Sequence, residues 1–560
     1  MLLGNLKGMP IFIKNKNMTR IALLLTVLLI SGCTMTKEKV DMLVRDARIY
    51  SVDSSFSMPE AMAIKEGRIY DIGSNDEITS KYSSSNTVSM KGKYIYPGWY
   101  DAHCHFVGYG LSLNEVELTG TKSVEEILER CREFAQQHPG TWITGRGWDQ
   151  NDWTEKAFPG KEILDREFPE RPVYLKRIDG HAAWINSRAM EIAAIDKNTT
   201  VEGGELLLHN GKASGILIDN AMDLVGKHIP PPDEEAYVTG ILQAQKNCFA
   251  VGLTSVSDAG LSTREVQIID SLQKAGQLNM RINAWLSPSE SNFKNYIEKG
   301  VVQNDHLTIG TLKLYADGAL GSRGAKMIED YSDDPGNKGL LVSEISVLKD
   351  YCMRALKNNY QVAIHCIGDD ANRQVLKLYG ELLEEDNDRR WRIEHAQIIH
   401  PDDFPLFQKY KVVPSVQSTH ATSDMYWAAD RIGAERMAGA YSYKTLLKQL
   451  GWIPNGSDFP VEDINPLYGF YSFVARKDHE GYPEDGFRME EALSREEALR
   501  AMTLWAAKAA FEDTFKGSLE KGKLADFVVT DQDIMTVDLH EIPGIKVHST
   551  YSGGIKVYER

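Results

Sequence analysis

The stretch Pro97-Gly98-Trp99-Tyr100-Asp101-Ala102-His103-Cys104-His105 decides how the rest of the chain is interpreted. Successive side chains of a strand point to opposite faces, so His103 and His105 lie on one face and Cys104 on the other. Two neutral imidazoles on one face make half of a metal site. The alternative is a pair of strand histidines that are bonded to neighbouring backbone, and the residues downstream decide between the two.

Strand-like segments further along the chain end in residues that can bind a metal. These residues are Lys313, His365, His395 and Asp458. Helical and apolar strand-like segments alternate here, which predicts a parallel α/β fold. The catalytic groups of a (β/α)8 TIM-type barrel come from the carboxyl ends of different strands. The sequence therefore predicts a barrel over residues 98–514, with its metal-binding side chains gathered at one end.

Two further units are predicted around the barrel. Short alternating runs in residues 41–97 return in residues 515–560, so both chain ends are expected to pair in a small β-sandwich domain. Residues from about 115 to 245 exceed what one βα unit needs. We interpret them as an insertion that covers the barrel mouth.

The composition is that of a globular protein that does not bind nucleic acid. Hydrophobic residues make up 42% of the chain and charged residues 25%, which is ordinary for a folded domain. The net charge of −16 and the absence of a basic stripe exclude a phosphate backbone as partner. Of six cysteines, Cys33 belongs to the N-terminal segment, and the other five are too scattered for a disulfide framework. The expected partner is a small-molecule substrate, and a homo-oligomer is compatible with this composition.

The N-terminal segment has the order of a secretory signal. Residues 21–30 form an apolar run that follows basic residues, precedes Ser31-Gly32-Cys33 and is too short to cross a bilayer. The ending Ile-Ser-Gly-Cys resembles a bacterial lipoprotein signal, in which Cys33 is lipidated. Residues 1–33 are then the signal peptide, with Met18 as a second candidate start, and a lipid anchors the protein to the membrane in the bacterial cell envelope, as a periplasmic or outer-membrane lipoprotein. The alternative is an ordinary signal peptide that ends near a cysteine.

The candidate ligands, taken together, resemble a known ligand set. The order His-x-His, Lys, His, His, Asp resembles that of the amidohydrolase superfamily, whose metals lie at the strand ends of a barrel. More narrowly, the sequence is similar to the family 3 branch that includes YtcJ-like hydrolases and N-substituted formamide deformylases. The resemblance runs from about Asp41 to the C-terminus. The matching stretches are Gly147–Gln150, Asp179–His181, Leu312–Arg323, Ala363–Asp369, Arg392–Ala396 and Asn455–Pro460.

The resemblance implies one or two divalent metal ions held by His103, His105, Lys313, His365, His395 and Asp458. Lys313 would be carboxylated on its amine, because an ammonium group cannot be a ligand; the alternative is a barrel lysine paired with a carboxylate such as Asp317. Imidazole and carboxylate ligands suit zinc, and manganese, iron or cobalt are also compatible. His365 and His395 could instead be core histidines. Asp458 would also act as general base, and its alternative role is a helix N-cap.

Other residues are assigned to the substrate side of the site. The resemblance and a titration near neutral pH make His181 a catalytic candidate that polarises a carbonyl or protonates a leaving group, with helix capping as the alternative. Trp148 and Asp149 are expected to line the pocket, although Trp148 could equally be a core residue. Arg323 would meet an anionic substrate group or merely close a loop. His420 is a further candidate.

These assignments predict a metal-dependent hydrolase of carbon–nitrogen bonds other than peptide bonds, acting on an N-substituted amide or formamide. One alternative keeps the same site and hydrolyses a lactone or another ester, because metal-activated water does not choose the leaving group. A second alternative is a ligand-binding lipoprotein without catalysis. The presence of a suitable residue at every ligand position argues against that reading.

The lipoprotein prediction is tested by the substitution Cys33→Ser. We expect the variant to leave the membrane fraction, because lipidation supplies the anchor and the acidic folded part cannot replace it. Cell fractionation followed by immunoblotting measures the distribution. A variant that stays membrane-bound and uncleaved would instead make residues 21–30 an ordinary anchor.

Overall fold

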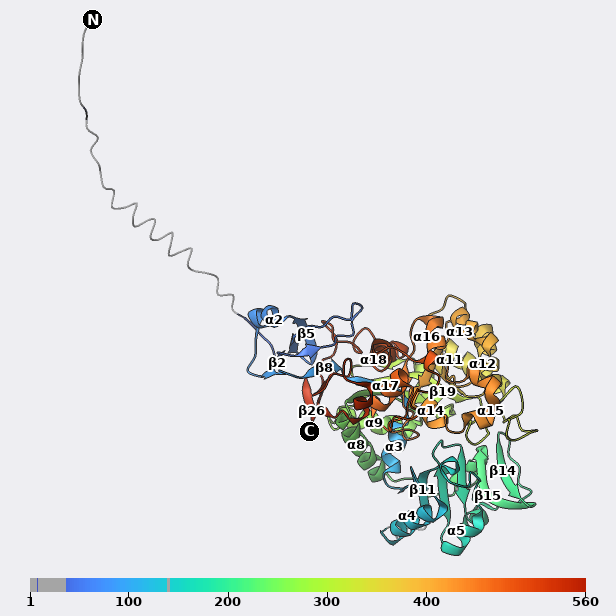
Figure 1. Cartoon of the computed structure of the whole chain (residues 1–560). Coiled ribbons are helices and arrows are strands. Elements are labelled where there is room, and N and C mark those ends of the chain that lie inside the picture. Colours follow the sequence, from blue (N-terminus) through green and yellow to red (C-terminus); the bar gives the residue numbers. More distant parts are fainter. Residues whose placement is uncertain (1–7, 9–36, 138–141) are drawn as a thin grey trace.

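The computed structural model describes Gly8 and residues 37–137 and 142–560. Apart from Gly8, the predicted signal peptide with Cys33 lies outside the described residues, so the lipid anchor stays a prediction. Within the described ranges, no helix is long and apolar enough to span a membrane. Figure 1 shows a sheet unit that contains the first described strands and the C-terminus, a barrel beside it, and an insertion on the far side of the barrel.

Within the described residues, eight parallel strands form the barrel, and each pairs with the next in the order β9, β16, β17, β19, β20, β21, β22 and β23. The barrel prediction is therefore confirmed. In the same order, the strands span Trp99–Cys104, Leu253–Leu261, Arg281–Leu286, Leu307–Tyr315, Gln361–Cys366, Arg392–His395, Val413–Gln417 and Asn455–Gly456.

Backbone hydrogen bonds close the barrel between its first and last strands. The N–H of Asp458 donates to the carbonyl of His103 over 2.8 Å, and the N–H of His105 donates to the carbonyl of Phe459 over 2.8 Å. Gly456 permits this approach, because a Cβ atom there would come within 2.4 Å of the His103 nitrogen. Closure therefore places Asp458 beside the His-x-His pair.

Helices between the strands pack their apolar faces against the barrel in one hydrophobic core. For example, the ring of Tyr379 in α12 meets the ring of Trp391, just before β21, edge-on at 5.1 Å. The principal helices of this layer are α3 (Phe106–Ser112), α8 (Glu234–Ala250), α9 (Thr263–Lys274), α11 (Ile345–Lys357), α12 (Asp369–Leu382), α13 (Phe404–Tyr410), α16 (Tyr443–Leu450), α17 (Pro466–Ala475), α18 (Arg495–Ala501) and α19 (Leu504–Ala509).

The two chain ends pair in one sheet. Strand β8 (Tyr94–Pro97) runs antiparallel to β24 (Phe527–Thr530), in a sheet of order β26-β25-β24-β8-β3. A second sheet, of order β5-β4-β2-β7, shares an apolar core with it. The expected pairing of the ends is observed, and the β-sandwich domain itself stays a prediction. The remaining strands are β2 (Met42–Arg45), β3 (Arg48–Ile49), β4 (Ala61–Lys65), β5 (Arg68–Gly73), β7 (Thr87–Ser89), β25 (Val547–Ser552) and β26 (Ile555–Glu559).

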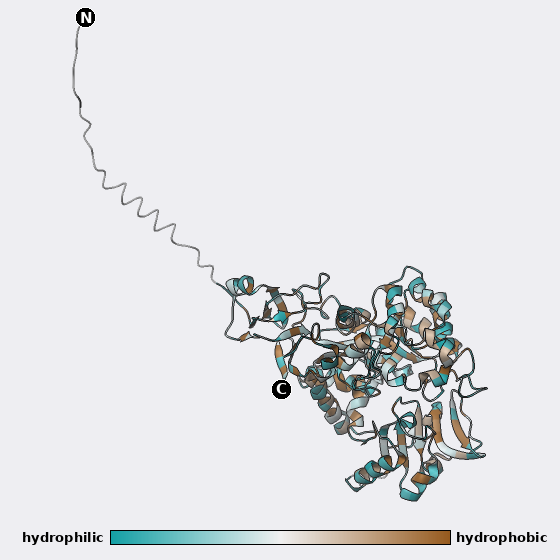
Figure 2. Cartoon of the chain, in the orientation of Figure 1, coloured by the Kyte–Doolittle hydropathy of each residue, from teal (hydrophilic) through white to brown (hydrophobic). Residues whose placement is uncertain are grey.

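The insertion is built on a sheet of its own, of order β10-β11-β12-β13-β15-β14. Figure 2 shows hydrophobic residues along its strands, which contribute to two separate apolar cores. The sheet ends at Asp219, and α8, within the range predicted for the insertion, packs instead against the barrel helix α3. The strands are β10 (Val116–Glu117), β11 (Ile143–Trp148), β12 (Val173–Arg177), β13 (Ala182–Ile185), β14 (Gly204–His209) and β15 (Lys212–Asp219).

Candidate metal centre

A cavity of about 1550 Å³ lies between the carboxyl ends of the barrel strands and the insertion. The insertion contributes to its wall with side chains of β11 and β12 and with His181. The barrel contributes every residue of the predicted ligand set, which are His103, His105, Lys313, His365, His395 and Asp458. The structure therefore brings together in one cavity residues that lie far apart in the sequence.

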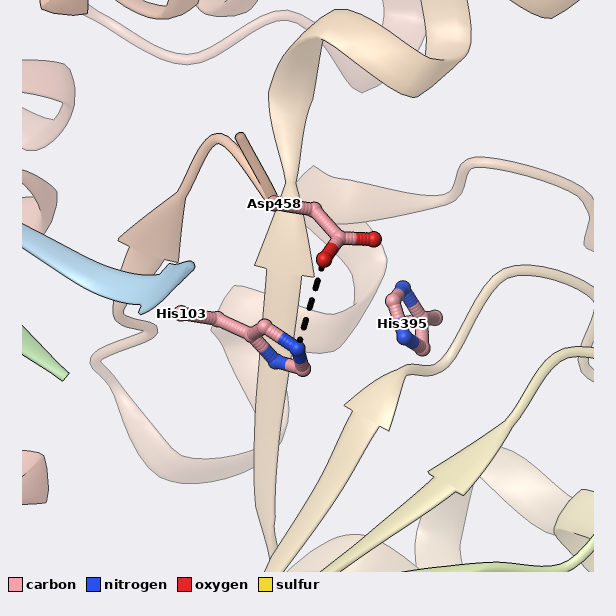
Figure 3. A group of neighbouring side chains, drawn as sticks. All are labelled: His103, His395 and Asp458. Atoms are coloured by element: carbon pink, nitrogen blue, oxygen red, sulfur yellow. Dashed lines mark ion pairs between the residues drawn. The ribbon is translucent and has the colours of Figure 1, made fainter. Parts of the chain in front are cut away.

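The centre of this group is formed by His103, His395 and Asp458, whose ligand atoms all lie within 4.8 Å of one another. Figure 3 shows the imidazole of His103 and the carboxylate of Asp458 facing each other, with His395 beside them. His103 Nε2 is 3.5 Å and His105 Nε2 is 3.2 Å from Asp458 Oδ1. His395 and Asp458 have φ values of 74° and 63°, a left-handed conformation that non-glycine residues adopt mainly at constrained sites.

Lys313 lies at the same centre, where no carboxylate of the described residues forms an ion pair with it. Its Nζ is 3.3 Å from His103 Nε2, and burial lowers the pKa of the amine to about 8. Asp317, the alternative partner, instead accepts hydrogen bonds from the backbone N–H groups of Ile367 and Gly368, at 3.0 and 2.8 Å. The ion-pair alternative for Lys313 is therefore not what the structure shows, and its carboxylation stays a prediction.

Several buried polar atoms at the centre have no hydrogen-bond partner among the described residues. They are Nδ1 of His395, Nε2 of His420 and Oδ1 of Asp458, whereas Nδ1 of His365 lies 3.3 Å from Asp317 Oδ1. Unsatisfied buried atoms are rare in folded proteins, and their convergence is explained if they face a metal ion. Burial lowers the pKa of His365 and His395 well below its usual range, which keeps both rings in the neutral form that binds metals. The donor set therefore fits a divalent metal ion.

Glu394 is a functional residue that the sequence analysis did not identify. Its carboxylate lies 2.5 Å from His103 Nδ1, and it also contacts Arg392 Nε at 2.6 Å and Ser415 Oγ at 2.8 Å. Burial raises the pKa of Glu394, but Arg392 and His103 outweigh burial and hold that pKa at about 2. The ionised carboxylate thus accepts from His103 Nδ1 and leaves Nε2 free for a metal.

Asp101, which the opening stretch contains, fastens the first strand to the loop that carries Asp458. Its carboxylate accepts from the backbone N–H of His103 at 3.1 Å and of Ser457 at 3.0 Å, and from Ser457 Oγ at 2.6 Å. On the other side, His105 Nδ1 is 3.1 Å from the carbonyl oxygen of Ala259, so its N–H can donate there. These bonds hold the histidines and Asp458 in register.

His181 enters the cavity from the insertion, on the loop between β12 and β13. Its Nδ1 lies 2.6 Å from Asp219 Oδ1, and its ring centroid is 5.1 Å from that of His365. Burial lowers the pKa of His181, but the hydrogen bond to Asp219 and the charges of Asp219, Asp179 and Asp317 together outweigh burial and raise that pKa above its usual value. Because Asp219 occupies Nδ1, Nε2 is the atom available to a substrate.

The predicted substrate-binding residues divide in two. Asp149 lines the cavity, where its carboxylate pairs with the buried Arg177. Trp148 is completely buried in the core of the insertion, outside the cavity lining, and its Nε1 donates to the carbonyl of Leu175. The core alternative for Trp148 is therefore the one that the structure favours.

Arg323 also lies outside the cavity lining. Its guanidinium contacts Asp333 at 2.9 and 3.1 Å, which is the loop-closing alternative. His420 does line the cavity, with Nε2 at 3.9 Å from Asp458 Oδ2. Because Arg323 is paired with Asp333, an anionic substrate group would have to bind to a cationic side chain other than Arg323.

Comparisons with known proteins agree with this geometry. Residues 86–558 match the sequence profile of a family described as "Amidohydrolase family". The chain is 34% identical over 542 residues to protein LONG AFTER FAR-RED 3 of Arabidopsis thaliana, covering 92% of this chain and 91% of that protein. It is 25% identical over 545 residues to N-substituted formamide deformylase of Arthrobacter pascens, covering 93% and 98%. An uncharacterized metal-dependent hydrolase from Pyrococcus horikoshii OT3 has a similar structure, with a TM-score of 0.72 at 27% identity over 89% of this chain and 99% of that one.

The metal site is tested by the composition of the purified protein. We expect one or two transition-metal ions per chain, because the ligand atoms converge. His395→Ala should lose most of the metal, whereas the matched control His181→Ala, outside the ligand group, should keep it. Elemental analysis measures the content, and a crystal structure with anomalous data shows the number of ions and the state of Lys313. Full metal content in His395→Ala would remove this residue from the ligand set.

Proposed function

Because this chain belongs to the amidohydrolase family and is a metal-dependent hydrolase, we propose that its substrate is an N-substituted amide, such as a formamide, whose carbon–nitrogen bond it cleaves with water. The observation that carries the proposal is the placement of two proton carriers in one cavity. Asp458 faces the cavity from the barrel and His181 faces it from the insertion. Amide hydrolysis takes a proton from the attacking water and gives one to the departing nitrogen, and these two groups can serve the two transfers from opposite sides of the cavity.

The histidines and Asp458 would hold a divalent ion, which would supply Lewis acidity and make water acidic enough to react near neutral pH. Asp458 is the base of the reaction, because among the described residues no donor is bonded to its Oδ1, which can take the proton of the attacking water. Glu394 keeps His103 in the tautomer with a free Nε2. We further propose zinc as the metal, because imidazole and carboxylate ligands suit it. We also propose Lys313 as a carboxylated ligand, because among the described residues its buried Nζ has only His103 as a hydrogen-bond partner.

His181 supports an amide over an ester as the substrate. An amide nitrogen is a poor leaving group that must gain a proton before the bond breaks, whereas an activated ester leaves without one. His181 is held by Asp219 through Nδ1, so Nε2 can deliver that proton from the insertion side. The lactone or ester alternative keeps the same metal site, and only for activated esters does the leaving group depart without the proton that His181 can supply.

The general base is tested by Asp458→Asn. The amide keeps an oxygen donor of the same size, so metal should largely remain bound, but it cannot accept the proton of water. We expect kcat to fall by roughly 10² or more on a panel of small N-substituted amides. His365→Ala serves as the contrast and should lose metal and activity together. Near-normal kcat in Asp458→Asn at full metal occupancy would make Asp458 a structural cap, with His181 the next candidate base.

The amide assignment is tested by His181→Asn with substrates that differ in leaving group. We expect kcat on N-alkyl formamides to fall by about 10², because their nitrogen needs the proton, and kcat on p-nitrophenyl esters to fall far less. Steady-state kinetics on metal-loaded protein measures both. Equal losses on the two series would show that His181 positions the substrate and does not act as the acid.

A further inference from the structure

Two cationic side chains of the insertion face the cavity without a counter-ion. Arg146 on β11 and Lys176 on β12 are partners in the parallel register, and both line the cavity. Arg146 Nη2 donates to the carbonyl of Ile178 at 2.8 Å, while its Nε is buried without a hydrogen-bond partner. Among the described residues, no carboxylate oxygen lies within ion-pair distance of either side chain. Like charges on neighbouring strands repel, so this pair is costly as it stands.

Three nearby carboxylates are already committed to other donors, whereas the carboxylate of Glu115, which also lines the cavity, has no bonded donor among the described residues. Asp179 pairs with Arg177 and accepts from the backbone N–H of His181 at 3.0 Å. Asp149 also pairs with Arg177. Glu117, the register neighbour of Arg146 on β10, accepts from the backbone N–H of Thr119 at 2.7 Å. Neutralising Arg146 and Lys176 with Asp179, Asp149 or Glu117 would therefore break bonds that the insertion uses.

The cationic pair lies close to the reacting groups. The guanidinium of Arg146 rests on Gly180, where a Cβ atom would lie 3.3 Å from Nη1. Gly180 directly precedes His181, whose ring is 5.1 Å from that of His365. An anion held by Arg146 would thus lie next to His181, which protonates the departing nitrogen. The anionic group would therefore belong to the part of the substrate that is attached to this nitrogen.

We propose that Arg146 and Lys176 form a carboxylate-binding subsite, and that the substrate is an N-substituted amide with an ionised carboxylate close to the scissile nitrogen. The proposal deepens the proposed function and rests on it for the hydrolytic step. The guanidinium offers paired N–H donors to the two carboxylate oxygens, and the ammonium adds a third charged donor. The role that the sequence predicted for Arg323, which pairs with Asp333, falls to these two residues.

The test compares two compounds that differ only in the carboxylate, N-formylphenylalanine and N-formyl-2-phenylethylamine. On the metal-loaded full chain, kcat/KM should be higher for the acid by roughly tenfold or more, the scale of one charge-assisted hydrogen bond. Arg146→Gln and Lys176→Gln should each remove most of this preference, and the double variant should remove all of it. Lys212→Gln, an exposed lysine on β15, is the matched control and should keep the preference.

Folding and function are separated by further measurements. Arg146→Lys keeps a charge and should retain part of the preference, and circular dichroism with metal analysis verifies that each variant is folded. If neither compound is hydrolysed, the proposed function fails, and calorimetric binding of the two compounds still tests the subsite. Equal kcat/KM for both compounds in the unmodified protein, or equal binding where there is no turnover, would overturn the subsite.

Discussion

The site depends on the two backbone hydrogen bonds that close the barrel between Asp458 and His103 and between His105 and Phe459. In an open sheet, the first and last strands would lie at opposite edges, and the His-x-His pair could not reach Asp458. Asp101 reinforces the closure through Ser457, at a point where Gly456 leaves room for the two strands to approach. The metal-binding geometry is therefore a property of the closed barrel rather than of any one loop.

Buried carboxylates then fix the orientation of the histidines. Glu394 accepts a hydrogen bond from Nδ1 of His103, and Asp219, in the insertion, pairs with Nδ1 of His181. Glu394 can be buried because Arg392 compensates its charge at Oε1, and Ser415 donates a hydrogen bond to Oε2, the oxygen that also faces His103. Removing one partner of such a pair leaves an uncompensated buried charge, at a cost of about 3–5 kcal/mol. The network is thus tied to folding as well as to the orientation of the ligands.

Much of this could be predicted from the sequence, because the strand-end residues follow a pattern that the chain shows directly. The barrel and the convergence of the six candidate ligands followed from that pattern. Glu394 was not predicted, because His395 was taken as the functional residue of this strand. The spacing of Arg392 and Glu394 could have indicated it, because residues two apart on a strand point to the same face. Trp148 and Arg323 could not be placed, because burial and loop pairing depend on the packing of the insertion. The register that joins Arg146 to Lys176 is likewise invisible in the sequence.

The barrel and the insertion carry different parts of the chemistry, and the physical constraints on them differ. Substituting a ligand on the barrel disturbs the metal site, and substituting a residue beside it disturbs the bonds that close the barrel. The cavity-facing positions of β11 and β12 include Thr144, Arg146, Tyr174 and Lys176, which alternate along the strands and take no part in closure. Their side chains can change while the ladder beneath them persists, because the ladder uses only the backbone. Relatives that keep the barrel ligands can therefore differ in substrate through these few positions, which is how one metal site can serve chemically different amides.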